Sequence, residues 1–160
     1  MSVAKKNSGL GMIEMVVVIA IIFTVLVGLL RLVTLEMRVQ IFAQEETAAY
    51  ILAREALEAV RNVRDEDWSN ISALTYDTRY YPEIVSNAWS LGSSNPGPVG
   101  IYTQWIEVHE VFRDASDDIA TSGSADADTV RLTAHIMWTR IGGASRTIEL
   151  ETYITNWQAY

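Results

Sequence analysis

The N-terminal part of the chain is dominated by one long apolar run. From Met12 to Leu32 nearly every residue is apolar, which makes a stretch of roughly 21 residues. A helix rises about 1.5 Å per residue, so this run extends about 30 Å, the thickness of one hydrocarbon core. The pattern predicts a transmembrane helix over residues 10–32.

Apolar residues continue beyond the run at helical spacings of three, four or seven. They are Leu32, Leu35, Val39, Phe42, Ala49, Ala53, Ala56, Val60 and Val63. No Pro occurs before Pro82, and no Gly follows Gly28 within this pattern, so nothing local interrupts a helix. We therefore expect one helix from about Leu10 to Val63, with residues 33–67 as its soluble, amphipathic half.

The polar face of that second half carries seven charged residues: Glu45, Glu46, Arg54, Glu55, Glu58, Arg61 and Arg64. We interpret most of this face as solvated, because charged side chains on a helix surface are usually exposed and their pairs contribute only tenths of a kcal/mol. The sequence assigns these residues no catalytic role.

A period of two residues replaces the helical one in the C-terminal part. It predicts strands at about 101–112, 129–141 and 147–157, with a hairpin at Gly142-Gly143 between the last two. Each of these two strands has an apolar face, formed by Val130, Leu132, Ala134, Ile136 and Trp138 in one and by Ile148, Leu150 and Ile154 in the other. Residues from Trp68 to Pro82 are expected to be a connecting region, followed by a loop at 92–98.

These elements predict an α+β fold. A small antiparallel β-sheet must cover its apolar face, and the long N-terminal helix supplies the only long apolar stripe nearby, so we expect the sheet to pack on the helix's C-terminal half. Residues 68–160 form the expected globular β-sheet domain. The chain has no Cys, so its stability must come from packing rather than from disulfides.

Charged residues flank the apolar run near the N-terminus, and one acidic residue lies inside it. Lys5 and Lys6 precede the apolar run and, by the positive-inside rule, hold that end in the cytoplasm. No small-residue cleavage site follows the run, whereas Gly9 stands just before it, so cleavage there removes a basic leader, 1–9, and keeps the membrane helix. Glu14 lies inside the apolar run, where a carboxylate costs about 2.5 to 3.5 kcal/mol and therefore needs a cation.

The run from Lys5 through Gly9 and Glu14 resembles the N-terminus of type IV pilins and type II secretion pseudopilins. In that family a prepilin peptidase cuts after a Gly, the new first residue is N-methylated, and a Glu stands five residues after the Gly. The resemblance implies processing between Gly9 and Leu10 and an assembly role for Glu14. This chain departs from the family in having Leu10 and Gly11 where Phe and then Thr or Ser are usual.

The resemblance also implies a pilin-like architecture, a place in the cell and a set of partners. We expect a structural subunit of a pilus-like or pseudopilus filament, in which Glu14 meets the Leu10 amine of a neighbour. Its partners are the prepilin peptidase, other pilin or pseudopilin subunits, an inner-membrane assembly platform and the lipid bilayer. The C-terminal domain is expected outside the cytoplasm as part of a single-pass protein, and on the cell surface after assembly.

Two questions stay open at this point. The segment 53–68 is similar to stretches of minor pilin-like proteins, which favours a minor subunit or pseudopilin over a major pilin, but a pilus, a secretion system and a DNA-uptake system all fit. The alternative function is a signal-anchored envelope protein that does not polymerise and whose β domain binds a ligand. In that case Glu14 is simply tolerated near the membrane interface.

Motifs for catalysis are missing from the sequence, so no enzyme activity and no cofactor are expected: there is no G-x-S-x-G, P-loop or H-E-x-x-H. His109 and His135 lie within strand patterns without metal-ligand spacing, and we interpret both as ordinary strand residues. The acidic segment from Asp114 to Asp128 is consistent with a calcium loop, but it does not match the EF-hand order, and a solvated loop is the favoured interpretation.

Net charge argues against a nucleic-acid ligand. The chain carries −8, which becomes about −10 when the two leader lysines are removed, and the domain lacks clustered Lys and Arg. Five aromatic residues either form a partner interface or pack in the core and along edge strands, and the sequence does not separate these possibilities: Tyr80, Tyr81, Trp89, Trp105 and Trp157.

Overall fold

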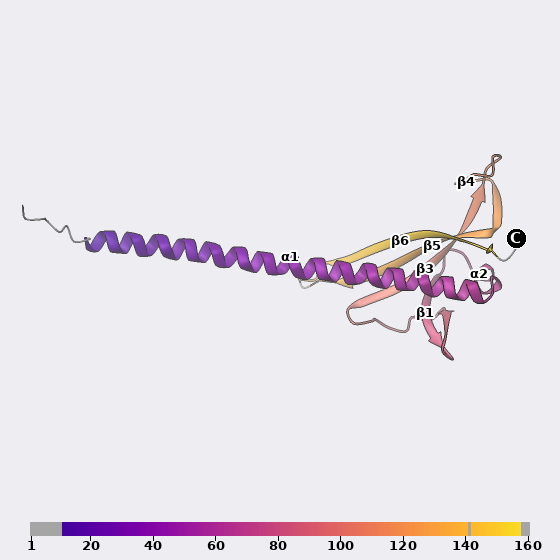
Figure 1. Ribbon diagram of the computed structural model, residues 1–160, viewed down its shortest axis with the longest axis horizontal. Helices are drawn as coiled ribbons and strands as arrows, with labels where there is room; N and C mark the ends of the chain where they lie inside the picture. The colour runs from indigo at the N-terminus through magenta and orange to yellow at the C-terminus, as the bar shows by residue number, and fades with distance from the viewer. Residues whose placement is uncertain (1–10, 141, 158–160) are drawn as a thin grey trace, which may run out of the picture. The chain divides into compact units, whose positions relative to one another are not determined.

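The computed structural model describes residues 11–140 and 142–157 (Figure 1). It begins with a long helix, α1 (Met12–Glu66), and a single turn, α2 (Ser69–Ser72). Six strands follow: β1 (Arg79–Val85), β2 (Ala88–Gly92), β3 (Tyr102–Arg113), β4 (Ile119–Ala120), β5 (Ser124–Thr139) and β6 (Ser145–Thr155). The predicted α+β fold is confirmed, since a six-stranded antiparallel sheet packs against a long N-terminal helix.

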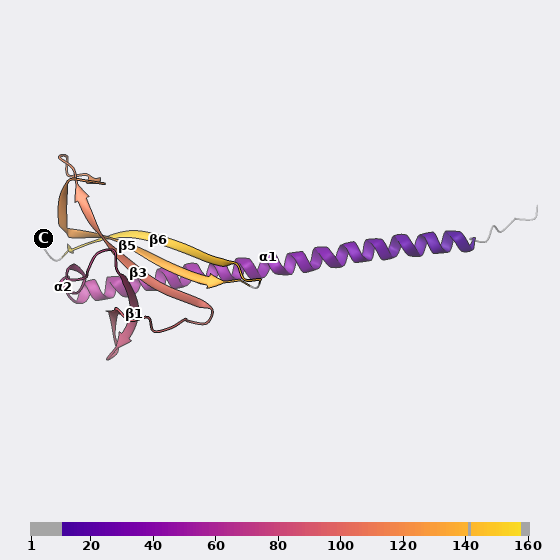
Figure 2. The same cartoon turned by 180° about the vertical axis from the view of Figure 1, so that it is seen from behind.

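The strands form one sheet in the order β2-β1-β3-β5-β6, and β4 pairs with β3 outside this path. All pairs are antiparallel. The C-terminal part of α1 runs along the sheet in both views (Figure 1, Figure 2). The three predicted strands correspond to β3, β5 and β6, each shifted by a few residues at its ends.

Contacts divide the chain into two compact units, Met1–Ala43 and Gln44–Tyr160. The boundary falls inside α1 rather than at its end, so the second half of the helix belongs to the same unit as the sheet. In the first unit every described residue is exposed except Phe42, which is half-buried. All the extensive burial therefore occurs in the second unit.

The core of the second unit lies between α1 and one face of the sheet. The helix contributes mostly small side chains: Ala49, Ala53, Ala56, Leu57, Val60 and Val63. The sheet contributes larger ones, including Ile106, Val108, Leu132 and Ile136, and all of these residues are buried. Alanine on the helix leaves room for branched residues on the strands, which is how facing layers reach native packing density.

The predicted apolar faces of β5 and β6 are confirmed. Val130, Leu132, Ala134 and Ile136 are fully buried and Trp138 nearly so, while Ile148 and Leu150 pack at the edge of the same core as buried Ile154. The Gly142-Gly143 hairpin is also confirmed, because both glycines have positive φ (110° and 88°) and the strands pair from Thr139 with Ser145 onward.

The expected connecting region between Trp68 and Pro82 is wrong in part. Ser69–Ser72 form α2, and β1 already begins at Arg79, forming a hairpin with β2. Pro82 is tolerated in the strand because β1 pairs with β3 only through Arg79 and Tyr80, so the missing N–H of Pro82 lies beyond that ladder.

A two-residue turn, Ser86-Asn87, joins β1 to β2. Both residues have positive φ (53° and 67°), as the turns that match strand twist require. Asn tolerates this conformation better than most residues, so Asn87 after the apolar pair Ile84 and Val85 was a usable hairpin signal in the sequence.

The acidic segment from Asp114 to Asp128 is not a single loop, which corrects the sequence interpretation. Ile119–Ala120 form β4 and pair with the end of β3, and Ser124 already starts β5. The register of β3 shifts between Glu110 and Phe112, a bulge that lets this end of the sheet bend. At this end of the sheet Phe112 pairs with both Ala120 of β4 and Ala125 of β5. A periodic pattern along the sequence does not reveal such pairs.

Glu45 does not lie on a solvated face, which is a second correction. Its side chain is 13% exposed; a carboxylate oxygen accepts a hydrogen bond from Trp138 Nε1 (3.2 Å), and Arg140 Nε lies 3.6 Å from the same oxygen. The Tyr102 hydroxyl donates to the Glu45 carbonyl oxygen (3.1 Å). Burial, and then the Glu45 charge, raises the pKa of Tyr102. Glu45, Tyr102, Trp138 and Arg140 thus form a polar cluster. It links the first residues of the second unit, on α1, to the end of the sheet where β5 turns into β6.

Candidate functional site

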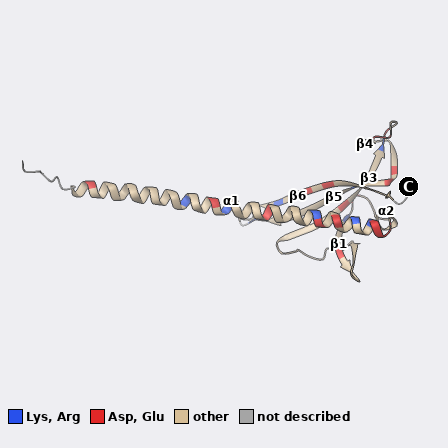
Figure 3. Cartoon of the chain, in the orientation of Figure 1, with Lys and Arg blue, Asp and Glu red and all other residues tan. Residues whose placement is uncertain are grey.

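Glu14 lies in the first turn of α1, and its side chain is exposed. It is the only charged residue between Met12 and Leu30, since the next one is Arg31. Figure 3 shows this as an uninterrupted uncharged stretch of helix between the first acidic and the first basic position. The helix is long and apolar enough to cross a membrane. No residue of its most apolar stretch is buried against another described part of the chain.

Threonine hydroxyls in this apolar segment and just beyond it donate hydrogen bonds to the helix backbone. Thr24 Oγ1 donates to the Ala20 carbonyl oxygen (2.8 Å), and Thr34 Oγ1 donates to the Arg31 carbonyl oxygen (2.8 Å). Such hydroxyl-to-backbone bonds remove the cost of placing a hydroxyl in lipid. Glu14 has no comparable internal partner in the part of the chain that the structure describes, and it is the one charged side chain of residues 12–30.

Gly9 and Leu10, the predicted processing residues, lie outside the described residues. The described chain begins at Gly11, whose carbonyl oxygen accepts hydrogen bonds from Glu14 N (2.9 Å) and Met15 N (3.2 Å). Gly11 is thus the N-terminal boundary residue of α1, and only Leu10 separates it from Gly9 in the sequence.

The acidic segment uses its carboxylates within the protein. Asp114 Oδ1 accepts hydrogen bonds from Ser116 N (2.8 Å) and Asp118 N (3.1 Å), and Asp126 pairs with Arg113 Nε (2.6 Å). Asp128 Oδ1 accepts from Asn156 Nδ2 (3.0 Å). Among the described residues no group of three or more His, Cys, Asp or Glu side chains is arranged to hold a metal ion.

Asp126 is a partly buried carboxylate that accepts hydrogen bonds from several donors. Its burial raises the pKa, but hydrogen bonds from Arg113, Thr129 and the Asp128 N–H outweigh that effect and hold the pKa below its usual range. A carboxylate in this situation stays ionised and fixes the bend between β3 and β5. Its environment is that of a structural ion pair.

Both histidines lie on strands, on the sheet face opposite α1. His109 Nδ1 is 2.6 Å from Asp77 Oδ1. The His135 ring stacks on Trp105 with a centroid distance of 5.0 Å and an interplanar angle of 5°. Glu149 Oε1 lies 3.4 Å from His135 Nδ1.

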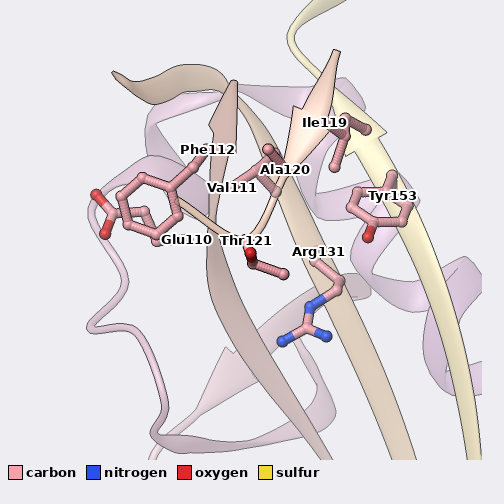
Figure 4. Close-up of a pocket in the computed structure, with 8 residues that line it drawn as sticks. All are labelled: Glu110, Val111, Phe112, Ile119, Ala120, Thr121, Arg131 and Tyr153. Atoms are coloured by element: carbon pink, nitrogen blue, oxygen red, sulfur yellow. The ribbon is translucent and has the colours of Figure 1, made fainter. Parts of the chain in front are cut away.

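A hollow of about 410 Å³ opens on the same face, where β4 folds over the sheet (Figure 4). The close-up shows Thr121 and Arg131 between Ile119 and Tyr153 on one side and Phe112 on the other. Arg131 Nη1 donates to Glu151 Oε2 (3.1 Å), so its charge is already balanced. Its lining mixes apolar side chains with the Glu110 carboxylate, the Thr121 hydroxyl, the Arg131 guanidinium and the Tyr153 phenol, and sequence periodicity gave no sign of the hollow.

The aromatic residues divide between core and surface. Tyr80, Tyr81 and Trp105 are buried, and Trp89 packs against the core. Trp157 is 57% exposed, although its Nε1 donates to Asp65 Oδ1 (3.2 Å). Hydrogen bonds from Arg64 and then Trp157 hold the pKa of Asp65 below its usual range. Most of the candidate interface aromatics therefore serve packing.

Comparison with known proteins adds no assignment: no family model, no curated protein and no solved structure matches this chain.

Proposed function

We propose that the chain is a structural subunit of a pilus-like or pseudopilus filament, cut after Gly9 and assembled through its N-terminal helix. The observation that carries the proposal is Glu14, a single carboxylate in the first turn of an exposed apolar helix that is long enough to span a bilayer. The resemblance of the residues around Gly9 to prepilin processing sites supports the same function.

The physical argument concerns compensation of a charge. In lipid the Glu14 carboxylate costs about 2.5 to 3.5 kcal/mol unless a cation lies nearby. Cleavage after Gly9 creates a positively charged amine on Leu10, four residues before Glu14. In a bundle of parallel helices the amine of one subunit meets Glu14 of its neighbour, and this pair aligns each added subunit.

The bilayer is the storage site of the subunit in this proposal. Residues 1–9 stay in the cytoplasm, and the unit that contains the sheet lies on the other side of the membrane. Assembly exchanges the lipid contacts of residues 12–32 for contacts with neighbouring helices, and the sheet unit forms the filament surface. The work of the protein is assembly, with no turnover of a substrate.

The hollow beneath β4 supports a second function. An anchored protein that stays monomeric and binds a small ligand at Arg131, Thr121 and Tyr153 also accounts for the apolar helix. In that protein residues 1–9 remain attached, and Glu14 needs no neighbour because it reaches the membrane interface.

Mass spectrometry of the intact protein separates the two functions. The full chain is produced in cells that contain a prepilin peptidase and purified in detergent. The filament function predicts loss of residues 1–9 and addition of one methyl group to the Leu10 amine. The matched control is Gly9→Val, which removes the processing glycine and should keep the leader.

An intact Met1 in the wild-type protein contradicts the proposed function and favours the anchored ligand-binding protein. Electron microscopy of surface fractions gives a second, independent readout, because a processed subunit is found in filaments and an anchored monomer is found only in membranes.

A further inference from the structure

A shallow hollow lies on one face of the apolar part of α1. It is lined by Phe23, Thr24, Val27, Gly28 and Arg31, and its volume is about 460 Å³. Thr24, Val27, Gly28 and Arg31 share one helix face, because positions three, four and seven apart lie above one another. Gly28 has no side chain, so the helix surface is lowest there. We call this depression the Gly28 hollow.

Packing within the chain does not account for Gly28. A Cβ atom built on it would meet no heavy atom within 4 Å, and its φ lies outside the left-handed region that favours glycine. Glycine in a helix interior costs about 1 kcal/mol relative to alanine. A molecule from outside the chain that approaches the helix backbone at this point gives the glycine a purpose.

The walls of the Gly28 hollow are apolar except at one end. Phe23 and Val27 present hydrocarbon, and the Thr24 hydroxyl already donates to the Ala20 carbonyl oxygen (2.8 Å). The Arg31 guanidinium supplies a positive charge, and it has no ion-pair partner among the residues that the structure describes. An occupant that matches these walls joins an apolar part to an anionic part.

The position of Arg31 along the helix indicates the level of that anion. Arg31 follows Met12 by 19 residues, which is about 28 Å at 1.5 Å per residue and close to the hydrocarbon thickness of a bilayer. Figure 3 shows it as the first basic position of α1. When residues 12–30 span a bilayer, Arg31 lies at the level of the lipid phosphates, and the Gly28 hollow lies among the adjoining acyl chains.

The charges next to Arg31 favour a headgroup with net negative charge. Arg38 lies seven residues further on the same helix face and is exposed, whereas Glu36 lies about 140° away around the helix. This face therefore offers two cations to one headgroup. A second copy of the chain at the same depth would bring its own Arg31 to this level, which is a like charge, so a lipid fits the site better than another helix does.

We propose that the Gly28 hollow binds one anionic phospholipid, with the lipid phosphate on Arg31 and one acyl chain against Gly28. The guanidinium carries N–H donors in a fixed fork that matches phosphate oxygens. This inference rests on insertion of α1 in a bilayer, which both functions considered above share. The lipid is a ligand of the membrane-inserted protein, and it has to leave before neighbouring helices cover this face.

Native mass spectrometry of the full chain in detergent micelles tests the site. Dioleoylphosphatidylglycerol is the anionic probe, and dioleoylphosphatidylcholine carries the same acyl chains on a headgroup without net charge. Arg31→Gln should weaken phosphatidylglycerol binding about fivefold and leave phosphatidylcholine binding unchanged. That factor corresponds to about 1 kcal/mol for one basic residue at a membrane surface.

Gly28→Leu fills the hollow and should weaken the binding of both lipids to a similar degree, because their acyl chains are identical. Two variants are matched controls. Arg54→Gln removes one exposed arginine from the sheet-covered part of α1, and Ala20→Leu adds a leucine eight residues away from Gly28. Both should bind the two lipids as the wild type does.

Three results would overturn the inference. The first is unchanged phosphatidylglycerol binding in Arg31→Gln, or equal weakening in Arg54→Gln. The second is displacement of phosphatidylglycerol by inorganic phosphate, which would indicate a site for a free anion. The third is a change in the dimer peak of Gly28→Leu without a change in lipid binding, which would make a second copy the occupant.

Failure of the inference is distinguishable from failure of the proposed function. A chain that keeps residues 1–9 and shows the expected lipid pattern contradicts the filament function and supports the lipid site of an anchored protein. A chain that is processed and binds both lipids equally in all variants supports the filament function and overturns the lipid site.

Discussion

The two parts of α1 use apolar side chains in opposite ways. Along residues 12–43 they are mostly large and exposed, as in Ile22 at 58% and Phe23 at 63%. From Ala49 onward the buried side chains are mostly small, and Ala49, Ala53 and Ala59 are completely buried. The apolar surface of the first part of α1 is therefore exposed in the single chain. The apolar surface of the second part is covered by the sheet.

The two surfaces of α1 differ in the size of their side chains. Alanine at the buried positions lets the helix backbone approach the sheet, where branched residues such as Ile106 and Ile136 fill the space. Valine, isoleucine and leucine in the exposed part provide large apolar area, which is what contact with lipid or with other helices requires.

Replacing Glu14 with Val tests the exposed part. Removing one partner of a buried charge pair costs about 3 to 5 kcal/mol, because the surviving charge is stranded, so Glu14→Val should abolish incorporation into filaments. Incorporation is measured by immunoblotting of sheared surface filaments. Glu46→Val, which removes an exposed carboxylate from the sheet-covered part of α1, is the control and should assemble normally. Normal incorporation of Glu14→Val would show that Glu14 has no role in register.

Truncating one isoleucine in each unit tests the location of the core. Ile106 is fully buried, so Ile106→Ala should lower the free energy of unfolding of the sheet unit by about 2 to 5 kcal/mol. Ile22→Ala should leave it unchanged. Tryptophan fluorescence during denaturation in detergent measures this unit, because all five tryptophans lie after Gln44. Equal destabilisation by the two variants would contradict the division of the chain.

Enlarging an alanine in each part tests the role of residue size. Ala53 is fully buried between helix and sheet, so Ala53→Leu should overpack the core and cost about 1 to 3 kcal/mol. Ala20 is exposed, and Ala20→Leu should not alter the unfolding of the sheet unit. The same fluorescence measurement reports both. A stable Ala53→Leu variant would mean that the helix does not need alanine to approach the sheet.

The ion pair between Arg113 and Asp126, at the bend between β3 and β5, contributes less to stability than the buried apolar side chains do. Because the pKa of Asp126 is lowered in the folded state, its contribution to stability is full above the unfolded-state pKa of about 4 and is lost as pH falls through the lower folded-state value. Asp126→Asn should cost about 1 kcal/mol at neutral pH and flatten the loss of stability below pH 4. An unchanged acid profile in Asp126→Asn would show that other carboxylates dominate it.

Long periodic segments made most of the fold predictable. α1, β3, β5 and β6 each repeat a helical or strand pattern over many residues, and Gly142-Gly143 marks a turn that few other residues can make. β1 was missed because Pro82 argues against a strand until its pairing is known. β4 was missed because a two-residue strand has no periodicity of its own.

The candidate functional residues also differ in whether the sequence alone reveals them. Glu14 stands out in the sequence because one carboxylate interrupts an apolar run, a local contrast that needs no tertiary information. The hollow beneath β4 and the burial of Glu45 depend on residues far apart in the chain, such as Glu45 with Trp138. A pattern along one segment carries no record of such pairs.

The long apolar helix, the lone acid near its start and the strand-rich C-terminal part could all be predicted from the sequence, because helical and strand periods are properties of consecutive residues. Which part of the helix is covered depends on the packing of the sheet. The tertiary structure also decides which charged residues are buried and where the sheet bends, because burial depends on what packs against a residue and not on its neighbours along the chain.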